Sequence, residues 1–395
     1  MWSAMTRHFA VPQFFRQMPN ALLQRYFAQH GLFGDLDFGK MKQRSVEALV
    51  DAWEALPEEQ RRALEAQLRE IFDLASQKGT LAILDEASWQ VSSGRSSDAA
   101  LVEKLSKMKS HFERAMTVFL DHPGLWRGAT HFHRADSLSR WKKRSGFPTK
   151  EACLDREIRP VFAAEIGRWF LKSWGCGRIC IVEVLRRDDR DYFFAYPEDF
   201  ADQSLEYVGT RLEPRAHNPA FEVVFVWLQK EGALEVNTKG GPKVLAAMQE
   251  LFARHILKLN ALPPLPKDKK EYELEALKRP GFSFAVQPTD GIEAMWVRRL
   301  RYASRSQEGD RVTFEANTDE NHKGVDDLMK RLKPAMPSDQ WYISDATISA
   351  RFAPQGDERA KTRTFELSHD SCSLKHDEHG LKLHAVLAAS KIESA

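Results

Sequence analysis

Hydrophobic residues recur with two different periods along this chain, and the change of period falls near Gly175. From residue 12 to about residue 174, apolar side chains follow the three-to-four-residue spacing of amphipathic helices. Beyond that point, short runs of alternating or continuous apolar residues predict β-strands separated by turn residues. The pattern therefore predicts an α+β multidomain protein that begins with an N-terminal helical domain at residues 1–174.

The clearest strand-to-helix pattern lies at residues 219–259. Residues 221–228 form a nearly continuous run of β-branched and aromatic side chains, which is typical of a strand covered on both faces. Pro242 suits the first position of a helix, and the apolar stripe that follows it continues to Ile256. The strands expected here are residues 179–185, 192–196, 205–212, 221–228 and 234–238. Hairpins closed by a helix predict an antiparallel α+β domain at residues 175–262.

The C-terminal part repeats this theme. Its strands are expected at residues 295–304, 311–318, 341–352 and 362–368, with one helix after the second strand and another after the fourth. The order β-β-α-β-β-α predicts a smaller two-layer sandwich at residues 283–395. Residues 263–282 are rich in Pro and Lys, which predicts a linker. A degenerate duplication and one continuous domain both remain open for the two β-containing segments.

Composition narrows the class of protein only a little. The chain has 395 residues, with 43% hydrophobic and 29% charged residues and a formal net charge of +2, so only a local basic patch would indicate nucleic acid. Four cysteines form no disulfide framework in a chain of this length. The N-terminus lacks the apolar run of a secretory signal, and no apolar run reaches the length of a membrane span. We therefore expect a cytoplasmic protein of bacterial type with no membrane partner.

Two basic clusters are candidates for nucleic-acid binding. In the first, Arg140, Lys142, Lys143 and Arg144 surround Trp141; in the second, alternation along a strand places Arg299, Arg301 and Arg305 on one face. Basic side chains beside aromatic rings can contact a phosphate backbone and stack on bases. The alternative is a solvated sheet face whose arginines pair with acidic neighbours such as Glu315.

The junction between the hairpin and its helix is a candidate phosphate site, formed by Lys239, Gly240, Gly241 and Lys243. A helix N-terminus offers unpaired N–H groups, and glycines allow an anion to approach the backbone. The sequence matches neither the phosphate-loop nor the dinucleotide-binding pattern. The alternative is a flexible turn between strand and helix.

Metal and catalytic signatures are weak. The C-terminal residues His369, Cys372, His376, His379 and His384 include zinc-ligand types, but their spacing fits no known zinc finger, so we assign no metal and no cofactor. Asp377 is expected to cap a helix that starts near His376. The acidic residues Asp199, Glu222 and Glu235 have no lysine at the offset of a metal-dependent nuclease, and no nucleophile motif is present.

These observations lead to three hypotheses of function. The first is a non-enzymatic cytosolic binding or scaffold protein that contacts nucleic acid and protein partners through its basic strand and helical surfaces. The second is an enzyme that acts on a phosphorylated or nucleotide substrate held at Lys239–Lys243. The third is an anion or nucleotide sensor that uses the same junction. Whether the chain is an enzyme stays open at this point.

Overall fold

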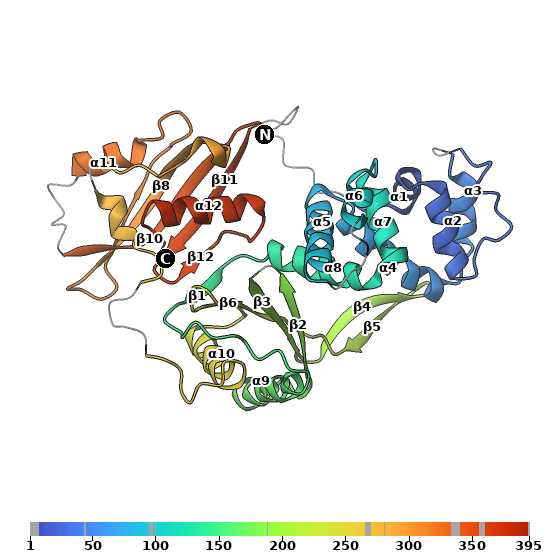
Figure 1. Ribbon diagram of the computed structural model, residues 1–395, viewed down its shortest axis with the longest axis horizontal. Helices are drawn as coiled ribbons and strands as arrows, with labels where there is room; N and C mark the ends of the chain where they lie inside the picture. The colour runs from blue at the N-terminus through green and yellow to red at the C-terminus, as the bar shows by residue number, and fades with distance from the viewer. Residues whose placement is uncertain are drawn as a thin grey trace. The chain divides into compact units, whose positions relative to one another are not determined.

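A computed structural model describes residues 8–42, 45–94, 98, 100–187, 189–264, 270–279, 281–332, 340–354 and 360–393. The chain is a mixed α+β protein that divides into two compact units, Met1–Asp136 (unit 1) and Ser137–Ala395 (unit 2) (Figure 1). Part of the predicted linker, at residues 265–269 and 280, lies outside the described residues.

Unit 1 is helical, as its apolar periodicity predicts. Its helices are α1 (Val11–Gln17), α2 (Asn20–Gln29), α3 (Glu47–Glu54), α4 (Glu58–Leu74), α5 (Gln77–Ser92), α6 (Leu101–Ser106), α7 (His111–Asp121) and α8 (Pro123–Ser137). Their apolar stripes meet in a core that buries Phe15, Phe27 and Trp53. Ser76 caps α5 by accepting a hydrogen bond from the Gly79 N–H at 3.1 Å, which separates α5 from α4.

Unit 2 contains a ten-stranded antiparallel sheet and a separate two-stranded ribbon, β4–β5. The strands are β1 (Trp141–Arg144), β2 (Cys180–Arg187), β3 (Arg190–Pro197), β4 (Asp202–Val208), β5 (Arg211–His217), β6 (Val223–Leu228), β7 (Ala233–Asn237), β8 (Ile292–Ser304), β9 (Arg311–Glu315), β10 (Trp341–Phe352), β11 (Lys361–Ser368) and β12 (Ser371–Cys372). The order in the large sheet is β2-β3-β6-β7-β1-β12-β11-β10-β8-β9.

Most predicted strands are confirmed, but two expectations about strands need correction. The predicted strand at residues 205–212 is wrong, because the chain turns at Gly209, whose φ of 61° is left-handed, and returns as β5. The basic stretch before Gly146 was not expected to contain a strand. It forms β1, which pairs with β7 on one side and β12 on the other and so joins the two halves of the sheet.

One half of the sheet carries its helices on one face. Helices α9 (Ile158–Trp174) and α10 (Pro242–His255) pack together; α9 also packs on β2 and β3, and α10 on β7 (Figure 1). The buried face beneath them includes Phe225, Leu234 and Val236. α9 therefore belongs to the core of unit 2, although its sequence continues the helical region that we assigned to residues 1–174.

The other half of the sheet carries its helices on the opposite face. Helices α11 (Gly324–Leu332) and α12 (Glu378–Ala389), with the short 3-10 helix η1 (Leu274–Lys278), share a core with Leu367 and Cys372. A second 3-10 helix, η2 (Pro288–Asp290), precedes β8. Trp141 of β1 pairs with Cys372, so these two side chains point to the same face of the sheet. Arg144 pairs with Leu234, and this pair points to the opposite face, because side chains alternate along a strand. The helices thus change faces at β1. None of the helices in the described ranges has the length and apolar character needed to cross a membrane.

Candidate functional site

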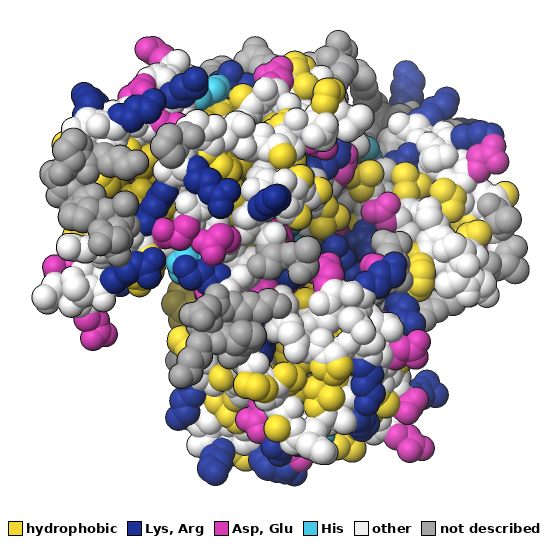
Figure 2. Space-filling view, turned by 60° about the vertical axis from the view of Figure 1, so that its left-hand side comes forward, with side chains coloured by type: hydrophobic (Ala, Val, Ile, Leu, Met, Phe, Trp, Pro, Cys, Tyr) yellow, Lys and Arg dark blue, Asp and Glu magenta, His cyan; other side chains and the backbone are white. Residues whose placement is uncertain are grey.

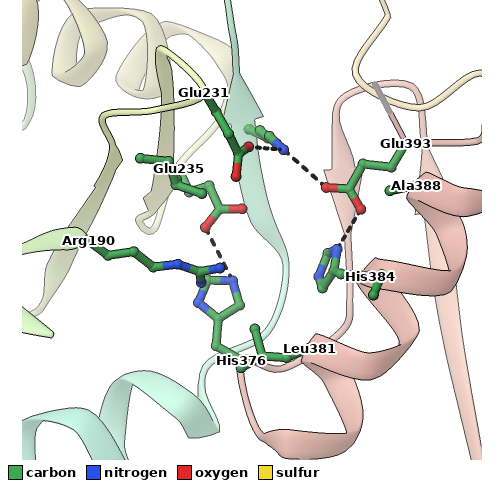
Figure 3. A pocket seen from close by; sticks show the side chains of 11 residues that line it. Arg190, Glu231, Glu235, His376, Leu381, His384, Ala388 and Glu393 are labelled. Carbon is green, nitrogen blue, oxygen red and sulfur yellow. Dashed lines mark hydrogen bonds and ion pairs between the residues drawn. The ribbon is translucent and has the colours of Figure 1, made fainter. Parts of the chain in front are cut away.

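A cavity of about 470 Å³ lies in unit 2 where the faces change, beside β1 and α12 (Figure 3). One wall is charged and the other is largely apolar. The lining residues are Lys143, Arg190, Leu228, Glu231, Glu235, His376, Leu381, His384, Ala385, Ala388 and Glu393.

Strand register explains why these side chains meet. Glu235 of β7 is the direct cross-strand partner of Lys143 of β1, so both side chains emerge on the face away from α10. On the same face, Arg190 of β3 stands opposite Leu228 of β6. The helix α12 and the residues around it form the other side of the cavity. α12 covers this face of the sheet on the β12 side of β1, and not on the β7 side.

Lys143 is the electrostatic centre of the site. Its side chain is only 6% exposed, and its Nζ lies 2.9 Å from Glu231 Oε2 and 3.1 Å from Glu393 Oε1. Burial opposes the charge on the ammonium group, but Glu393, Glu231 and Glu235 outweigh it and raise the pKa of Lys143. The lysine therefore stays charged and joins the β6–β7 turn to the segment after α12.

His384 of α12 forms a second pair with Glu393. Its Nδ1 lies 2.8 Å from Glu393 Oε2. Burial opposes protonation of this imidazole, but hydrogen bonds to Cys372 and Glu393 raise the pKa of His384 to about 10. Burial likewise opposes ionisation of Glu393, whose pKa is nevertheless lowered by His384 and Lys143. His384 and Glu393 are thus an imidazolium–carboxylate pair at neutral pH.

Glu235 and His376 form a pair of a different kind. Both are buried, and His376 Nε2 lies 3.3 Å from Glu235 Oε2. Burial raises the pKa of Glu235 against the influence of His384, Lys143 and Arg190, while burial and the same cations lower the pKa of His376 well below its usual value. Both shifts favour the uncharged forms of the two groups, a protonated carboxyl group and a neutral imidazole, over an ion pair.

Two atoms of this pair have unused hydrogen-bonding capacity. Within the described residues, His376 Nδ1 is buried and has no hydrogen-bond partner, and Glu235 Oε2 is buried and has only the 3.3 Å contact with His376 Nε2, which lacks hydrogen-bond geometry. Buried polar atoms in native proteins are nearly always paired, so such atoms beside a cavity indicate a missing ligand or solvent partner. A protonated carboxyl group can donate a hydrogen bond, and a neutral imidazole can donate or accept one. The pair can therefore bind a polar group or exchange protons with it.

The first predicted basic cluster contributes one residue to the cavity. Lys143 lines it, and Trp141 stacks on His376 with ring centroids 4.4 Å apart and an interplanar angle of 8°. Lys142 points to the other face and lies 3.0 Å from Asp370. Arg144 donates a hydrogen bond to the Pro263 carbonyl at 2.6 Å. Arg140 is exposed just before β1. Trp141 and Lys143 are buried in the sheet, so any nucleic-acid contact there would rest on the remaining three residues.

The second basic cluster lies on and just after β8. Arg299 lies 2.8 Å from Glu366, Arg301 lies 3.6 Å from Asp345, and the Arg305 guanidinium lies over the ring of Tyr342. Figure 2 shows Lys and Arg side chains scattered among Asp and Glu side chains on one face of the molecule. Acidic neighbours thus balance two of the three arginines, and nucleic-acid binding through this strand stays a prediction.

The predicted phosphate junction is separate from the cavity. Lys239 forms a salt bridge with Asp199 and lies over the ring of Phe221 at 3.7 Å. Lys243, in the first turn of α10, is exposed. Gly241 is the N-cap of α10, and Gly240 has a left-handed φ of 101°. The lysine nearest the glycines is therefore paired with a carboxylate, and phosphate binding at this junction stays a prediction.

We expect the two glycines of this junction to differ sharply in tolerance. A Cβ at Gly240 would lie 2.5 Å from Val244 Cγ2 and 2.9 Å from Trp174 Cζ2, whereas a Cβ at Gly241 would meet open space. Gly240→Ala should therefore lower the free energy of unfolding by roughly 1–3 kcal/mol, since strain at positive φ adds to the clash. Gly241→Ala is the matched control and should change it by less than about 0.5 kcal/mol. Urea unfolding measures both; equal effects would contradict the packing role of Gly240.

The C-terminal histidines do not converge on one point. His376 and His384 line the cavity with ring centroids 6.3 Å apart, His369 Nδ1 donates a hydrogen bond to the Tyr272 carbonyl, and His379 packs on Phe352. Asp377 caps α12 by accepting a hydrogen bond from the Gly380 N–H, as predicted. Across the described ranges, no group of three or more His, Cys, Asp or Glu side chains has an arrangement suited to a metal ion.

Sequence reasoning did not assign Arg190, Glu231 or Glu393 to a site. No local motif connects them, because they come from β3, a turn and the chain's end, and strand order alone brings them to Lys143. Glu235 offered one usable signal, since it is a lone acidic residue in an otherwise apolar strand. A charged residue at such a position must find a partner or a function.

Comparison with known proteins adds no assignment. No family model matches the sequence, and no curated protein matches it.

Proposed function

We propose that this chain is a binding protein for a small anionic molecule, which occupies the cavity beside β1 and α12. The observation that carries the proposal is the buried Glu235–His376 pair, which has unused hydrogen-bonding atoms and lines a cavity that Arg190 also lines. The volume of about 470 Å³ lies within the range of small-molecule sites. A polar group of the ligand would complete the hydrogen bonds that the protein leaves open.

The sign of the ligand's charge follows from the charges that line the cavity. Lys143 and His384 are matched by the carboxylates of Glu231 and Glu393. Burial favours the neutral forms of Glu235 and His376. Burial opposes the charge on Arg190, but Tyr192, Glu235 and Glu231 outweigh it and raise the pKa of its guanidinium group, so Arg190 stays charged. A guanidinium group binds carboxylate or phosphate with two parallel hydrogen bonds, so Arg190 favours an anion as the ligand.

The apolar wall suits the rest of such a ligand. Leu381, Ala385 and Ala388 lie on one side of α12 at helical spacing, and Leu228 faces the cavity from β6. This division supports an anion that also carries an uncharged portion. Free thiols at all four cysteines support a reducing compartment, which is consistent with the cytoplasmic location we propose.

Thermal stability measured with inorganic phosphate, AMP and succinate tests this proposal. A ligand that binds only the folded state must raise the melting temperature, and we expect at least one of these anions to do so. Arg190→Gln should weaken binding about tenfold or more, because a hydrogen bond to a charged group contributes roughly 1.5–3 kcal/mol.

Arg215→Gln is the matched control for this experiment. Arg215 is an exposed arginine on the ribbon strand β5 and does not line the cavity, so its replacement should leave the shift unchanged. Circular dichroism verifies that Arg190→Gln is folded. Equal loss in both arginine variants, or no shift with any of the three anions up to millimolar concentration, would refute the proposed function.

A further inference from the structure

We infer that His376 takes up a proton from solvent when an anion enters the cavity, so that binding at this site is coupled to protonation. This inference rests on the proposed function and names the group that adapts the site to its ligand. No covalent bond of the ligand is made or broken. The proton comes from water or buffer and is released when the anion leaves.

The ring of His376 is held in a fixed position. It stacks on Trp141, which belongs to the central strand β1. Its Nε2 lies 3.3 Å from Glu235 Oε2 (Figure 3). Nδ1 has no hydrogen-bond partner among the described residues, although the ring is buried. The imidazole therefore has one nitrogen available and little freedom to move away from the cavity. A group placed in this way can gain a proton without rearrangement of the fold.

Every element around His376 contributes a charge or a titratable group. Strand β1 supplies Lys143, β3 supplies Arg190, the β6–β7 turn supplies Glu231, β7 supplies Glu235, α12 supplies His384, and the segment after α12 supplies Glu393. Without a ligand, burial and the positive charges of His384, Arg190 and Lys143 keep the pKa of His376 well below its usual value. An anion beside the ring reverses the local field and raises this pKa.

The other titratable groups are poorly placed to take up the proton. Burial raises the pKa of Glu235 and favours the form that already holds a proton, and a nearby anion raises this pKa further. His384 is protonated well above neutral pH, and Lys143 is charged in its pair with two carboxylates. His376 is therefore the group whose protonation changes when an anion binds. Its new positive charge would join that of Arg190 in holding a doubly charged anion.

Isothermal titration calorimetry measures this proton directly. The titrant is whichever of phosphate, AMP and succinate gives the largest thermal shift, used at pH 7.5 in Tris, HEPES and PIPES. The observed heat changes with the ionisation enthalpy of the buffer, and the slope is the number of protons taken up. We expect a slope between one half and one proton for the wild type, and a value near zero for His376→Gln. His379→Gln, which changes a histidine three residues away that does not line the cavity, should keep the wild-type slope.

The outcomes separate the two proposals. Absence of any binding heat refutes the proposed function. Binding with no dependence on the buffer refutes proton uptake and leaves the proposed function standing. A wild-type slope that persists in His376→Gln shows that another group, or the anion itself, takes up the proton, and this also overturns the inference.

Discussion

Replacing Lys143 by methionine is expected to lower the free energy of unfolding by about 3–5 kcal/mol, the cost typical of breaking a buried ion pair by removing one partner. Methionine keeps the length of the side chain but leaves Glu231 and Glu393 without the ammonium group that lies 2.9 and 3.1 Å from them. Glu393 is also buried, so among the described residues its charge would retain only His384 as a partner. Urea unfolding measures the loss. Hydrogen exchange of the peptide that covers β1 tests whether the loss is local to the sheet junction.

Lys142→Met is the matched control, because Lys142 is the preceding residue of the same strand and points to the opposite face. Its salt bridge joins it to Asp370, and the two side chains are 36% and 61% exposed. An exposed pair of this kind contributes about 0–1 kcal/mol. Adding Glu393→Gln to Lys143→Met should recover part of the lost stability, since fewer charges are then buried without a partner. Equal losses in the two single variants would show that Lys143 has no special electrostatic role.

The sequence predicts where the helices and strands of this protein lie better than it predicts which of them lie next to one another. The hairpin at residues 223–237 and the start of α10 at Pro242 follow from local patterns of apolar residues and from the fixed φ of proline. β1 could not be predicted in the same way, because its letters Trp-Lys-Lys-Arg resemble a solvent-exposed basic segment. They form a central strand only because β7 and β12 lie on either side. The strand conformation of this segment therefore depends on pairing with residues that are distant in the sequence.

The candidate site shows the same limit. His376 and His384 could be singled out by residue type, although the zinc chemistry that prompted their selection has no geometric support among the described residues. Their actual neighbours, Glu235 and Glu393, lie about 140 and 10 positions away in the chain. Only the antiparallel register places Glu235 opposite Lys143 and on the face that α12 covers. Side-chain chemistry could be read from the sequence, but the pairing that gives it a function depends on topology.

Stability is expected to fall at alkaline pH because of His384. The folded state holds this proton with a pKa of about 10, compared with an ordinary histidine value of 6.5. A raised pKa in the folded state gives stability that is fully present below about pH 6.5 and is lost as the pH rises through about 10. Each unit of difference corresponds to about 1.4 kcal/mol, so the stabilisation lost between pH 7 and pH 10 is on the order of 3 kcal/mol.

The variant His384→Gln isolates this contribution. Glutamine cannot carry the imidazolium charge that lies 2.8 Å from Glu393, so the variant should already lack the stabilisation at pH 7. The difference in unfolding free energy between wild type and variant should therefore shrink steadily from pH 7 to pH 10, as measured by urea unfolding at each pH. His379→Gln provides the comparison on the same helix, because burial lowers the pKa of His379 and the residue is uncharged throughout this range. A difference that stays constant with pH would mean that His384 contributes through packing alone. The assignment of a charged His384–Glu393 pair would then be wrong.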